Sequence, residues 1–337
     1  MTNYKTTEYF KSFQQDILNI DENNFEQKAL QLFRFQSEHN EIYKSYLKAR
    51  HIDVSQVTDL ESIPFLPIRL FKDFDVVSGK VEDFEGFYSS SGTTGAITSK
   101  HYFWSEEFYL KHALRLFESE YGLITNFHVL ALLPAYLERK GSSLVSMSQH
   151  FIEKSASEYS GFYLYNQKEL VDKLKALQNK PGKILLLGVT FALLDLAESN
   201  LTFPEIGQLI VMETGGMKGR RREMIREEVH DILKKYFSVK KIHSEYGMTE
   251  LMSQSYSKGE GKYTLPSTMH VMLRDVNDPF AYSKRKHGGI NVIDLANFHS
   301  CAFIETQDLG RFDENGYLEV LGRIDNSEIR GCNLMVN

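Results

Sequence analysis

Apolar and polar residues alternate at helical spacing along the first part of the chain. Within residues 7–49, apolar side chains recur among charged ones with the period of an amphipathic helix. Gln36 and Asn40 interrupt this stripe, so one long helix and two shorter helices both fit. Residues 63–67, IPFLP, must be extended, because each proline keeps the preceding residue out of the helical region. We therefore expect residues 1–60 to form a helical region packed on the core.

The middle of the chain has a different pattern, in which short apolar runs alternate with amphipathic stretches. The apolar runs have the length and composition of strands buried on both faces of a sheet, and they lie at residues 127–133, 183–188 and 208–212. The amphipathic stretches predict helices near residues 105–120, 167–179, 190–199 and 220–237. Strands that alternate with helices predict an α/β fold in which helices flank a sheet, and we assign this fold to residues 61–260.

The pattern changes again in the last third of the chain, where short strands follow one another without long helices between them. The expected strands are residues 270–275, 289–295, 301–306 and 317–321. Residues 313–316, DENG, form a strong turn signal between the last two strands. We expect residues 261–337 to be a small β-rich subdomain, and the polar run at residues 257–264, SKGEGKYT, to be a mobile loop.

Composition and charge narrow the class of protein. The 337 residues are 42% hydrophobic, which is enough for a large core, and the net charge of −6 does not predict binding to nucleic acid. Two cysteines do not make a disulfide framework and favour a reducing compartment. The N-terminus has no apolar signal core, and no apolar run approaches the ~18 residues that span a bilayer. We expect a soluble, cytoplasmic protein without membrane insertion.

The run SSSGTTGAITSK at residues 89–100 consists largely of glycine and small hydroxyl residues. Such a loop can offer backbone N–H groups and hydroxyls to a phosphate, although its glycines are too close together for the P-loop pattern. A plain surface turn is the alternative. If the loop binds phosphate, the binding residues are Ser90, Ser91, Gly92, Thr93, Thr94 and Gly95.

Two further segments follow predicted strands. Gly215 and Gly216, in ETGG, would let a flat or anionic ligand approach the backbone closely, and ligands favour the carboxyl ends of strands in open α/β sheets. Thr249 and Glu250, in HSEYGMTE, place a hydroxyl beside a carboxylate, which suits a phosphate oxygen and the Mg²⁺ next to it. The alternatives are a tight turn for the first segment and a helix start for the second, with Thr249 as the cap.

The last candidate segment combines TQDLG with LGRID near the end of the chain. Asp308 follows a strand, where its carboxylate can accept hydrogen bonds from two neighbouring hydroxyls such as those of a ribose. Arg323 lies past the next strand and can reach the same sugar or a phosphate. A β-hairpin with a surface ion pair is the alternative.

Taken together and in this order, the segments closely resemble the adenylate-forming superfamily of acyl-CoA synthetases, luciferases and peptide-synthetase adenylation domains. SSSGTTG is similar to its phosphate loop, ETGGMKG to its adenine-facing loop, EYGMTE to its Tyr-Gly-x-Thr-Glu motif, ETQDLG to its ribose-binding motif and LGRIDNSEIRG to its hinge motif. FLPIRLFKDF and LLPAYLERKGSSLVSM resemble the acyl-protein synthetase branch, the LuxE-type ligases, with phenylacetate–CoA ligases as the next nearest relatives. The resemblance implies an α/β adenylate-forming large domain with a small C-terminal β unit, without the usual mobile C-terminal domain.

The resemblance also implies an activity and a role for each motif residue. LuxE-type enzymes activate a fatty acid with ATP, hold it as a thioester on their own cysteine and pass it to an acyl reductase. By this resemblance Thr249 would contact the α-phosphate and Glu250 would hold Mg²⁺. Asp308 and Arg323 would fix the ribose. Tyr246 would stack near adenine or line the acyl tunnel.

The two cysteines differ in context. Cys301 lies in the apolar run CAFIET, and we expect it to be a buried core residue. Cys332 lies close to the end of the chain, where LuxE-type enzymes are acylated, and it is the residue that fits the acyl carrier. The domain that is missing normally brings a catalytic lysine to the reacting groups, and its substitute stays open among Lys72, Lys100, Lys218 and Arg220.

Two other functions fit the same residues. One is a CoA or carrier-protein ligase that another chain completes. The other is a catalytically inactive nucleotide- or acyl-binding partner that regulates a reductase. The intact Glu250 and Asp308 argue against the second alternative, whereas the absence of the domain with the catalytic lysine keeps it open.

Overall fold

The computed structural model describes residues 2–90, 98–133, 141–199, 201–215, 224–283 and 286–324. The chain divides into two compact units, and each unit joins segments that are distant in sequence. The first unit comprises residues 1–109, 249–253 and 265–337, and the second comprises residues 110–248 and 254–264. The division of the sequence at residues 60 and 260 stays a prediction.

The first unit begins with helices that the polar residues of the sequence separate. Its helices are α1 (Thr2–Asp16), α2 (Phe25–His39), α3 (Glu41–Ala49) and α4 (Leu70–Asp73). The side chain of Asn40 ends the run of α2 by accepting the N–H of Tyr43 and capping α3. Gln36 is buried and donates to the carbonyl oxygens of Asn297 and Phe298. The interruptions of the apolar stripe are therefore buried polar contacts, and of the two arrangements that the sequence left open, the structure has the shorter helices.

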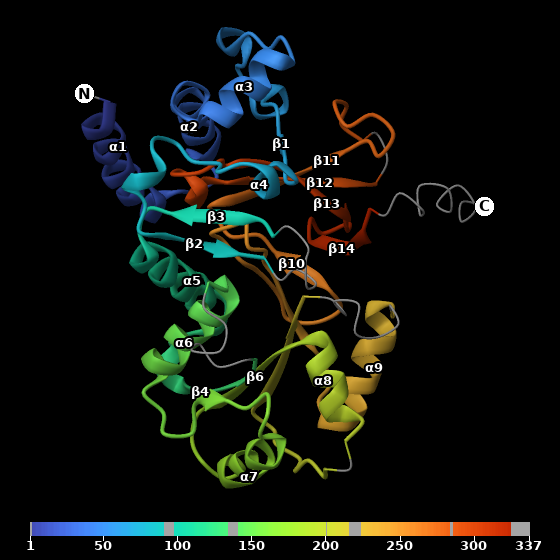
Figure 1. Cartoon of the computed structure of the whole chain (residues 1–337). Helices are drawn as coiled ribbons and strands as arrows, with labels where there is room; N and C mark the ends of the chain where they lie inside the picture. The colour runs from blue at the N-terminus through green and yellow to red at the C-terminus, as the bar shows by residue number, and fades with distance from the viewer. Residues whose placement is uncertain are drawn as a thin grey trace, which may run out of the picture. The chain divides into compact units, whose positions relative to one another are not determined.

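The β structure of the first unit lies beside these helices (Figure 1). Its strands are β1 (Leu66–Pro67), β2 (Gly86–Ser89), β3 (Lys100–Phe103), β11 (Met269–Arg274), β12 (His287–Asp294), β13 (Phe303–Phe312) and β14 (Leu318–Arg323). The last four pair antiparallel in chain order, β1 pairs parallel with β13, and β2 pairs with β3 as a separate hairpin. Phe33 of α2 packs edge-on against Phe303 of β13, so the helical layer covers this sheet.

The second unit has the alternating order of strands and helices that the sequence predicts. Its strands are β4 (Phe127–Leu132), β5 (Gly161–Phe162), β6 (Lys183–Val189), β7 (Leu209–Thr214), β8 (His243–Tyr246), β9 (Ser255–Ser257) and β10 (Lys262–Thr264). Its helices are α5 (Glu106–Tyr121), which begins just before the unit, α6 (Ser143–Ser155), α7 (Gln167–Leu177), α8 (Thr190–Ala197) and α9 (Arg226–Phe237). The strands β5, β4, β6, β7 and β8 are parallel neighbours, and β9 and β10 extend the sheet antiparallel.

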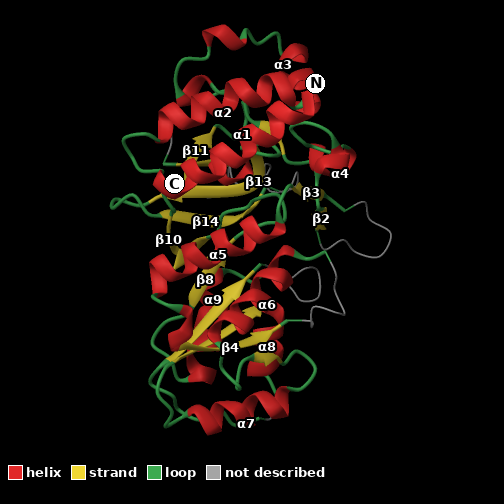
Figure 2. Ribbon diagram, turned by 90° about the vertical axis from the view of Figure 1, so that its left-hand side faces the viewer, coloured by secondary structure: helices red, strands yellow, loops and turns green. Residues whose placement is uncertain are grey.

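The core of the second unit lies on both faces of β6. Ile184 and Leu186 belong to a cluster with residues of α7, α8 and α9. Leu185 and Leu187, which point to the opposite face, are also buried. Figure 2 shows helices close to these strands. The predicted α/β class is confirmed.

Two local expectations differ from the structure. The polar run 257–264 is a tight β-turn connection between β9 and β10 rather than a mobile loop, because Gly259 and Gly261 adopt positive φ angles that turn the chain sharply. The helix α6 was not predicted. Among the described residues, no helix combines the length and the apolar character needed to cross a membrane.

Candidate functional site

The hairpin of β2 and β3 presents the predicted phosphate loop at its end. Ser89 pairs with Lys100, and the next residue continues the pairing. The N–H of Ser90 donates to the carbonyl oxygen of Ser99 at 3.1 Å, and the N–H of Ser99 donates to Ser90 Oγ at 2.9 Å. Ser90 therefore closes the base of the loop. Ser91, Gly92, Thr93, Thr94 and Gly95 lie outside the described residues.

The segment with Thr249 and Glu250 is tied to this hairpin by its backbone. His101 of β3 donates from Nδ1 to the carbonyl oxygen of Thr249 at 2.8 Å. Asn297 donates from Nδ2 to the carbonyl oxygen of Glu250 at 2.8 Å. Burial lowers the pKa of His101 to about 4, so this imidazole is neutral near pH 7. The motif is thus held in place from two sides.

The helix-start interpretation of this segment is wrong. Thr249 and Glu250 form a turn, and an extended stretch follows it. The N–H groups of Met252 and Ser253 both donate to Asp294 Oδ2 at 2.9 Å. A buried carboxylate therefore takes the donors that a first helical turn would leave unpaired.

The Glu250 carboxyl group is buried, with 7% of the residue exposed. Burial raises its pKa, while a hydrogen bond from Ser99 and the charges of Arg323 and Lys72 partly oppose the rise. A cation at this carboxylate would remove the cost of burying its charge, so the residue fits a role in holding Mg²⁺. In the described part of the chain, no group of three His, Cys, Asp or Glu side chains is arranged so that it could hold a metal ion by itself. Phosphate oxygens and water would have to complete the coordination.

The expectation that Asp308 follows a strand and that Arg323 lies past the next one is wrong, because β13 continues to Phe312 and β14 to Arg323. The two residues are cross-strand partners on β13 and β14. Arg323 Nε lies 3.8 Å from Asp308 Oδ1, and 80% of the arginine side chain is exposed against 14% of the aspartate side chain. At 3.8 Å, and with the arginine largely in solvent, this contact contributes little to stability. The guanidinium group is accessible to a ligand beside an aspartate that is largely enclosed.

The residues of the second unit lie at the carboxyl ends of β7 and β8. Gly215 follows β7 with a φ of 69°, a conformation that favours glycine. Thr190 at the start of α8 donates to the Gly215 carbonyl oxygen and to Glu213 Oε2. Tyr246 is buried, and its ring meets that of Tyr263 edge-on at 5.9 Å between centroids. Gly216 lies outside the described residues.

Two buried carboxylates, Glu213 and Glu245, were not predicted as part of the site. They lie on neighbouring strands at the end of the β7–β8 ladder, where Thr214 pairs with Glu245. Burial raises the pKa of Glu213, but the neighbouring His230, 3.7 Å from its carboxylate, together with Ser244, Arg226 and Thr190, outweighs burial and lowers the pKa overall. Burial raises the pKa of Glu245 to about 7, although Thr214 donates a hydrogen bond to its carboxylate.

The structure brings several predicted residues together within the first unit. Ser90 contacts Ser99, Ser99 bonds to Glu250, and the charge of Arg323 acts on both Glu250 and Asp308. Lys72 acts on Glu250 through its charge, whereas Lys100 lies 3.9 Å from Asp75. Lys218, Arg220 and Cys332 lie outside the described residues.

Cys301 is buried in the first unit, as predicted. Its thiol contacts the carbonyl oxygen of Phe303 at 3.5 Å, and burial raises its pKa to about 12. A thiol with this pKa is not a nucleophile near neutral pH. The sequence motifs gave no signal for His101 or Asn297, which hold the Thr249–Glu250 segment from positions distant in the chain. Ser99 lies in the quoted glycine- and hydroxyl-rich run but was not singled out as a site residue.

Comparison with known proteins gives relatives along most of the chain. No protein-family model matches it. A long-chain-fatty-acid–luciferin-component ligase from Aliivibrio fischeri is 22% identical over 333 residues, which cover 90% of this chain and 85% of that protein. A ligase of the same name from Photorhabdus luminescens is 31% identical over 67 residues, 20% of this chain and 57% of that protein.

Solved structures with the same fold are adenylate-forming ligases. ATP-bound MatB from Rhodopseudomonas palustris matches 74% of this chain at 18% identity with a TM-score of 0.51, and the chain spans half of that protein's length. A 2-hydroxyisobutyryl-CoA ligase with 2-HIB-AMP and CoA matches 95% of this chain and 69% of its own at 15% identity, with a TM-score of 0.65. These matches confirm the resemblance and the predicted fold class: the chain is related to the LuxE-type ligases and has the fold of the adenylate-forming superfamily.

Proposed function

We propose that this protein activates a carboxylic acid, a fatty acid in particular, with ATP and passes the acyl group to a thiol. The observation that carries the proposal is the group of Glu250, Asp308 and Arg323 in the first unit. The carboxylate of Glu250 is buried, and the positive charge of Arg323 acts on it. The exposed guanidinium of Arg323 also pairs with the largely enclosed Asp308. This arrangement suits a metal-bound triphosphate attached to a ribose. The similarity to ATP-using ligases supports it.

The first half-reaction joins two anions. A carboxylate oxygen of the acid attacks the α-phosphorus of ATP, the bond from that phosphorus to the bridging oxygen breaks, and pyrophosphate leaves. The product is an acyl-adenylate, in which AMP replaces oxide as the leaving group. Mg²⁺ supplies positive charge to the pyrophosphate oxygens when bound, and Glu250 would hold it. The protein contributes by positioning and by electrostatic stabilisation.

Charge and hydrogen bonding in the first unit would serve this step. The Ser90–Ser99 pair would hold the base of the phosphate loop, and Thr249 would contact the α-phosphate. Arg323 would neutralise phosphate charge or bind the ribose beside Asp308. Of the proposed substitutes for the usual catalytic lysine, Lys72 is favoured over Lys100, because its charge acts on Glu250. Gly215, Gly216 and Tyr246 would face the adenine or the acyl chain.

The second half-reaction transfers the acyl group to sulfur. A thiolate attacks the acyl carbon, the bond from that carbon to the AMP oxygen breaks, and a thioester forms. Buried Cys301 is excluded as this thiol by its raised pKa, and Cys332 is the proposed carrier. From Cys332 the acyl group would pass to an acyl reductase. CoA or a carrier protein is the alternative acceptor, since a structural relative is a CoA ligase.

Pyrophosphate exchange over a panel of fatty acids of increasing chain length tests the first step. We expect ATP-, Mg²⁺- and acid-dependent exchange, and no exchange with any acid would refute the proposal in favour of an inactive binding partner. Intact mass then tests the second step. Wild type should gain one acyl group that neutral hydroxylamine removes, Cys332→Ser should lose the adduct but keep exchange, and Cys301→Ser should keep both. Exchange without an adduct would assign the acceptor to CoA or another chain.

A further inference from the structure

The ribose-binding motif lies on an irregular part of β13. Gly289 pairs with Leu309 and Asn291 pairs with Glu305, so Ile290 alone stands opposite residues 306–308. Three residues of one strand against one of its neighbour make an extended β-bulge. Bulges re-aim side chains and are frequent next to functional sites. The residue that the bulge re-aims here is Asp308.

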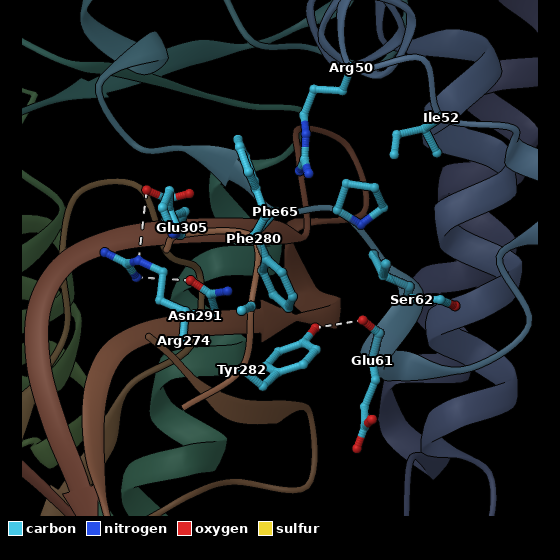
Figure 3. Close-up of a pocket in the computed structure, with 14 residues that line it drawn as sticks. Arg50, Ile52, Glu61, Ser62, Phe65, Arg274, Phe280, Tyr282, Asn291 and Glu305 are labelled. Atoms are coloured by element: carbon cyan, nitrogen blue, oxygen red, sulfur yellow. Dashed lines mark hydrogen bonds and ion pairs between the residues drawn. The ribbon is translucent and has the colours of Figure 1, made fainter. Parts of the chain in front are cut away.

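Arg274 of β11 holds this bulge from its buried side. Its Nη1 donates to the carbonyl oxygen of Ile290 at 2.9 Å, and its Nη2 donates to the carbonyl oxygen of Thr306 at 2.6 Å. The same guanidinium donates to Asn291 Oδ1 at 2.9 Å and lies 3.8 Å from Glu305 Oε1. Figure 3 shows Arg274 directed at both of these side chains. One planar group therefore joins the two strands at the point where their regular ladder is lost.

Thr306 carries the connection on to Asp308. Its hydroxyl donates to the carbonyl oxygen of Ile290 at 2.8 Å, which also accepts from Arg274. The N–H of Asp308 donates to that hydroxyl at 3.1 Å. The backbone of the aspartate is thereby fixed through two hydrogen bonds to the carbonyl group that the guanidinium holds.

The surroundings of Arg274 are not closely packed, so its hydrogen bonds are what holds the bulge. Arg274 and Glu305 border two cavities of about 90 and 230 Å³, and the second is also lined by Thr306 and Gln307. Gly289 leaves room for the guanidinium, because a Cβ there would lie 2.5 Å from Arg274 Cζ. Only 6% of the arginine side chain is exposed, and burying such a charge is costly unless its donors are paired. The fixed fork of an arginine satisfies this requirement, whereas a lysine would not.

We infer that Arg274 is a positioning residue that fixes the bulge of β13 and thereby aims Asp308 at the ribose of the bound nucleotide. The inference rests on the proposed role of Asp308. Arg274 acts on the bulge through the carbonyl groups of Ile290 and Thr306, to which it donates. Its loss should therefore affect the recognition of the sugar rather than the chemistry of the phosphate.

The test compares ATP with 2′,3′-dideoxy-ATP in pyrophosphate exchange. Wild type should prefer ATP, and Asp308→Ala should lose this preference, because a site built to bind a hydroxyl penalises its absence. Arg274→Lys keeps the charge but not the fork, and we expect its preference to fall to that of Asp308→Ala. Its KM for ATP should rise by up to about 10²-fold, as for a small misplacement of a binding group, with little change in kcat. The double variant should be no worse than Asp308→Ala alone.

Arg311→Met is the control, because Arg311 is an arginine of β13, the strand that carries Asp308, and it pairs with Glu319 at the surface. It should keep the full preference for ATP. Thr306→Val removes the hydroxyl at nearly constant shape and should reproduce Arg274→Lys, whereas Thr306→Ser should restore the preference. Full preference in Arg274→Lys or additive effects in the double variant would overturn the inference.

Folding and the proposed function are separated by the same set of variants. If Arg274→Lys does not fold, Thr306→Val decides, and failure of both to fold would overturn the inference by showing that these groups hold the subdomain rather than the aspartate. If Asp308→Ala keeps the wild-type preference for ATP, the proposed role of Asp308 is wrong. If Asp308→Ala loses the preference and Arg274→Lys keeps it, only the inference about Arg274 is wrong.

Discussion

Glu245 gives a prediction about stability whose size follows from its environment. The side chain is buried at the end of β8, and its carboxylate accepts from Thr214. Burial and then the nearby charge of Glu213 raise its pKa from 4.5 to about 7. Glu245→Gln keeps the shape of the group and the acceptor for Thr214 but cannot ionise. The variant therefore isolates the cost of the buried charge.

The sign follows from proton binding in the two states. Between pH 4.5 and about 7, folded Glu245 keeps its proton while the unfolded chain releases it. The free energy of unfolding therefore loses this contribution as the pH rises through that window. The difference between about 7 and 4.5, at about 1.4 kcal/mol for each pKa unit, corresponds to about 3 kcal/mol. The contribution is fully present below pH 4.5 and absent above pH 8.

Buried histidines act in the opposite direction and must be separated. Burial lowers the pKa of His101 and His243 to about 4. An unfolded histidine binds a proton more readily than these do, so their contribution to stability grows as the pH rises towards neutrality. The absolute pH profile of the wild type therefore contains opposing slopes. The difference between wild type and Glu245→Gln removes the slopes that both proteins share.

Urea unfolding followed by circular dichroism at pH 5, 6.5 and 8 measures this difference. Relative to Glu245→Gln, the wild type should lose about 2–3 kcal/mol between pH 5 and pH 8, since part of the contribution is already lost at pH 5. Glu205→Gln, an exposed glutamate of the same unit, is the control and should follow the wild type. Parallel profiles for wild type and Glu245→Gln would refute the argument, because they would mean that Glu245 ionises equally in both states.

Two further predictions concern the proposed nucleotide site. Glu250→Gln should lower pyrophosphate exchange by about 10²–10³-fold, since it removes one electrostatic contact made at the reacting phosphate, and activity within a few-fold of wild type would remove Glu250 from the metal site. Replacing Thr93 and Thr94 together by alanine should raise the KM for ATP without lowering the melting temperature, and normal exchange at limiting ATP would mean that the loop does not bind phosphate.

The strands of the second unit could be predicted closely from the sequence. The observed β4, β6 and β7 lie within two residues of the predicted runs. These strands are buried on both faces, so their apolar character is continuous and needs no partner to be recognised. Three of the four antiparallel strands predicted in the first unit also lie within two residues of the observed strands, and the turn residues Asn315 and Gly316 separate the last two. The strand β13 extends to Phe312, six residues beyond its predicted end, because its polar residues 306–308 do not have the apolar pattern of a strand.

The helix α6 escaped prediction for a physical reason. The helix contains four serines, three in its first turns and one at its last residue. A serine hydroxyl can bond to nearby backbone groups and thereby favour conformations other than the helix. In the structure Ser148 donates to the carbonyl oxygen of Leu144, and Ser155 donates to that of Ile152. These hydroxyls are satisfied within the helix itself and can be buried. Their effect depends on packing, which local propensity does not contain.

In the candidate site, too, the contacts between distant residues could not be predicted from the sequence. Motif residues such as Asp308 and Glu250 could be chosen from the sequence, because each belongs to a short run with a known chemical use. The residues that hold them could not, since register decides which groups meet across a sheet and a shift of one residue changes every pair. Arg274 lies more than thirty positions before Asp308, and nothing local to it predicts a contact with residues 290 and 306.

Buried charged side chains are therefore the residues among which further functional roles should be sought. A buried charged side chain whose donors go to backbone carbonyl groups and to other polar side chains has no packing advantage over an apolar residue of similar size. Arg274 is such a side chain, and two of its donors bond to carbonyl groups at the stretch where the pairing of β12 with β13 is interrupted. Its cost is offset only if the bulge must keep a defined shape. The proposed role of Asp308 provides that requirement, because an aspartate must present both carboxylate oxygens to two adjacent hydroxyls at once.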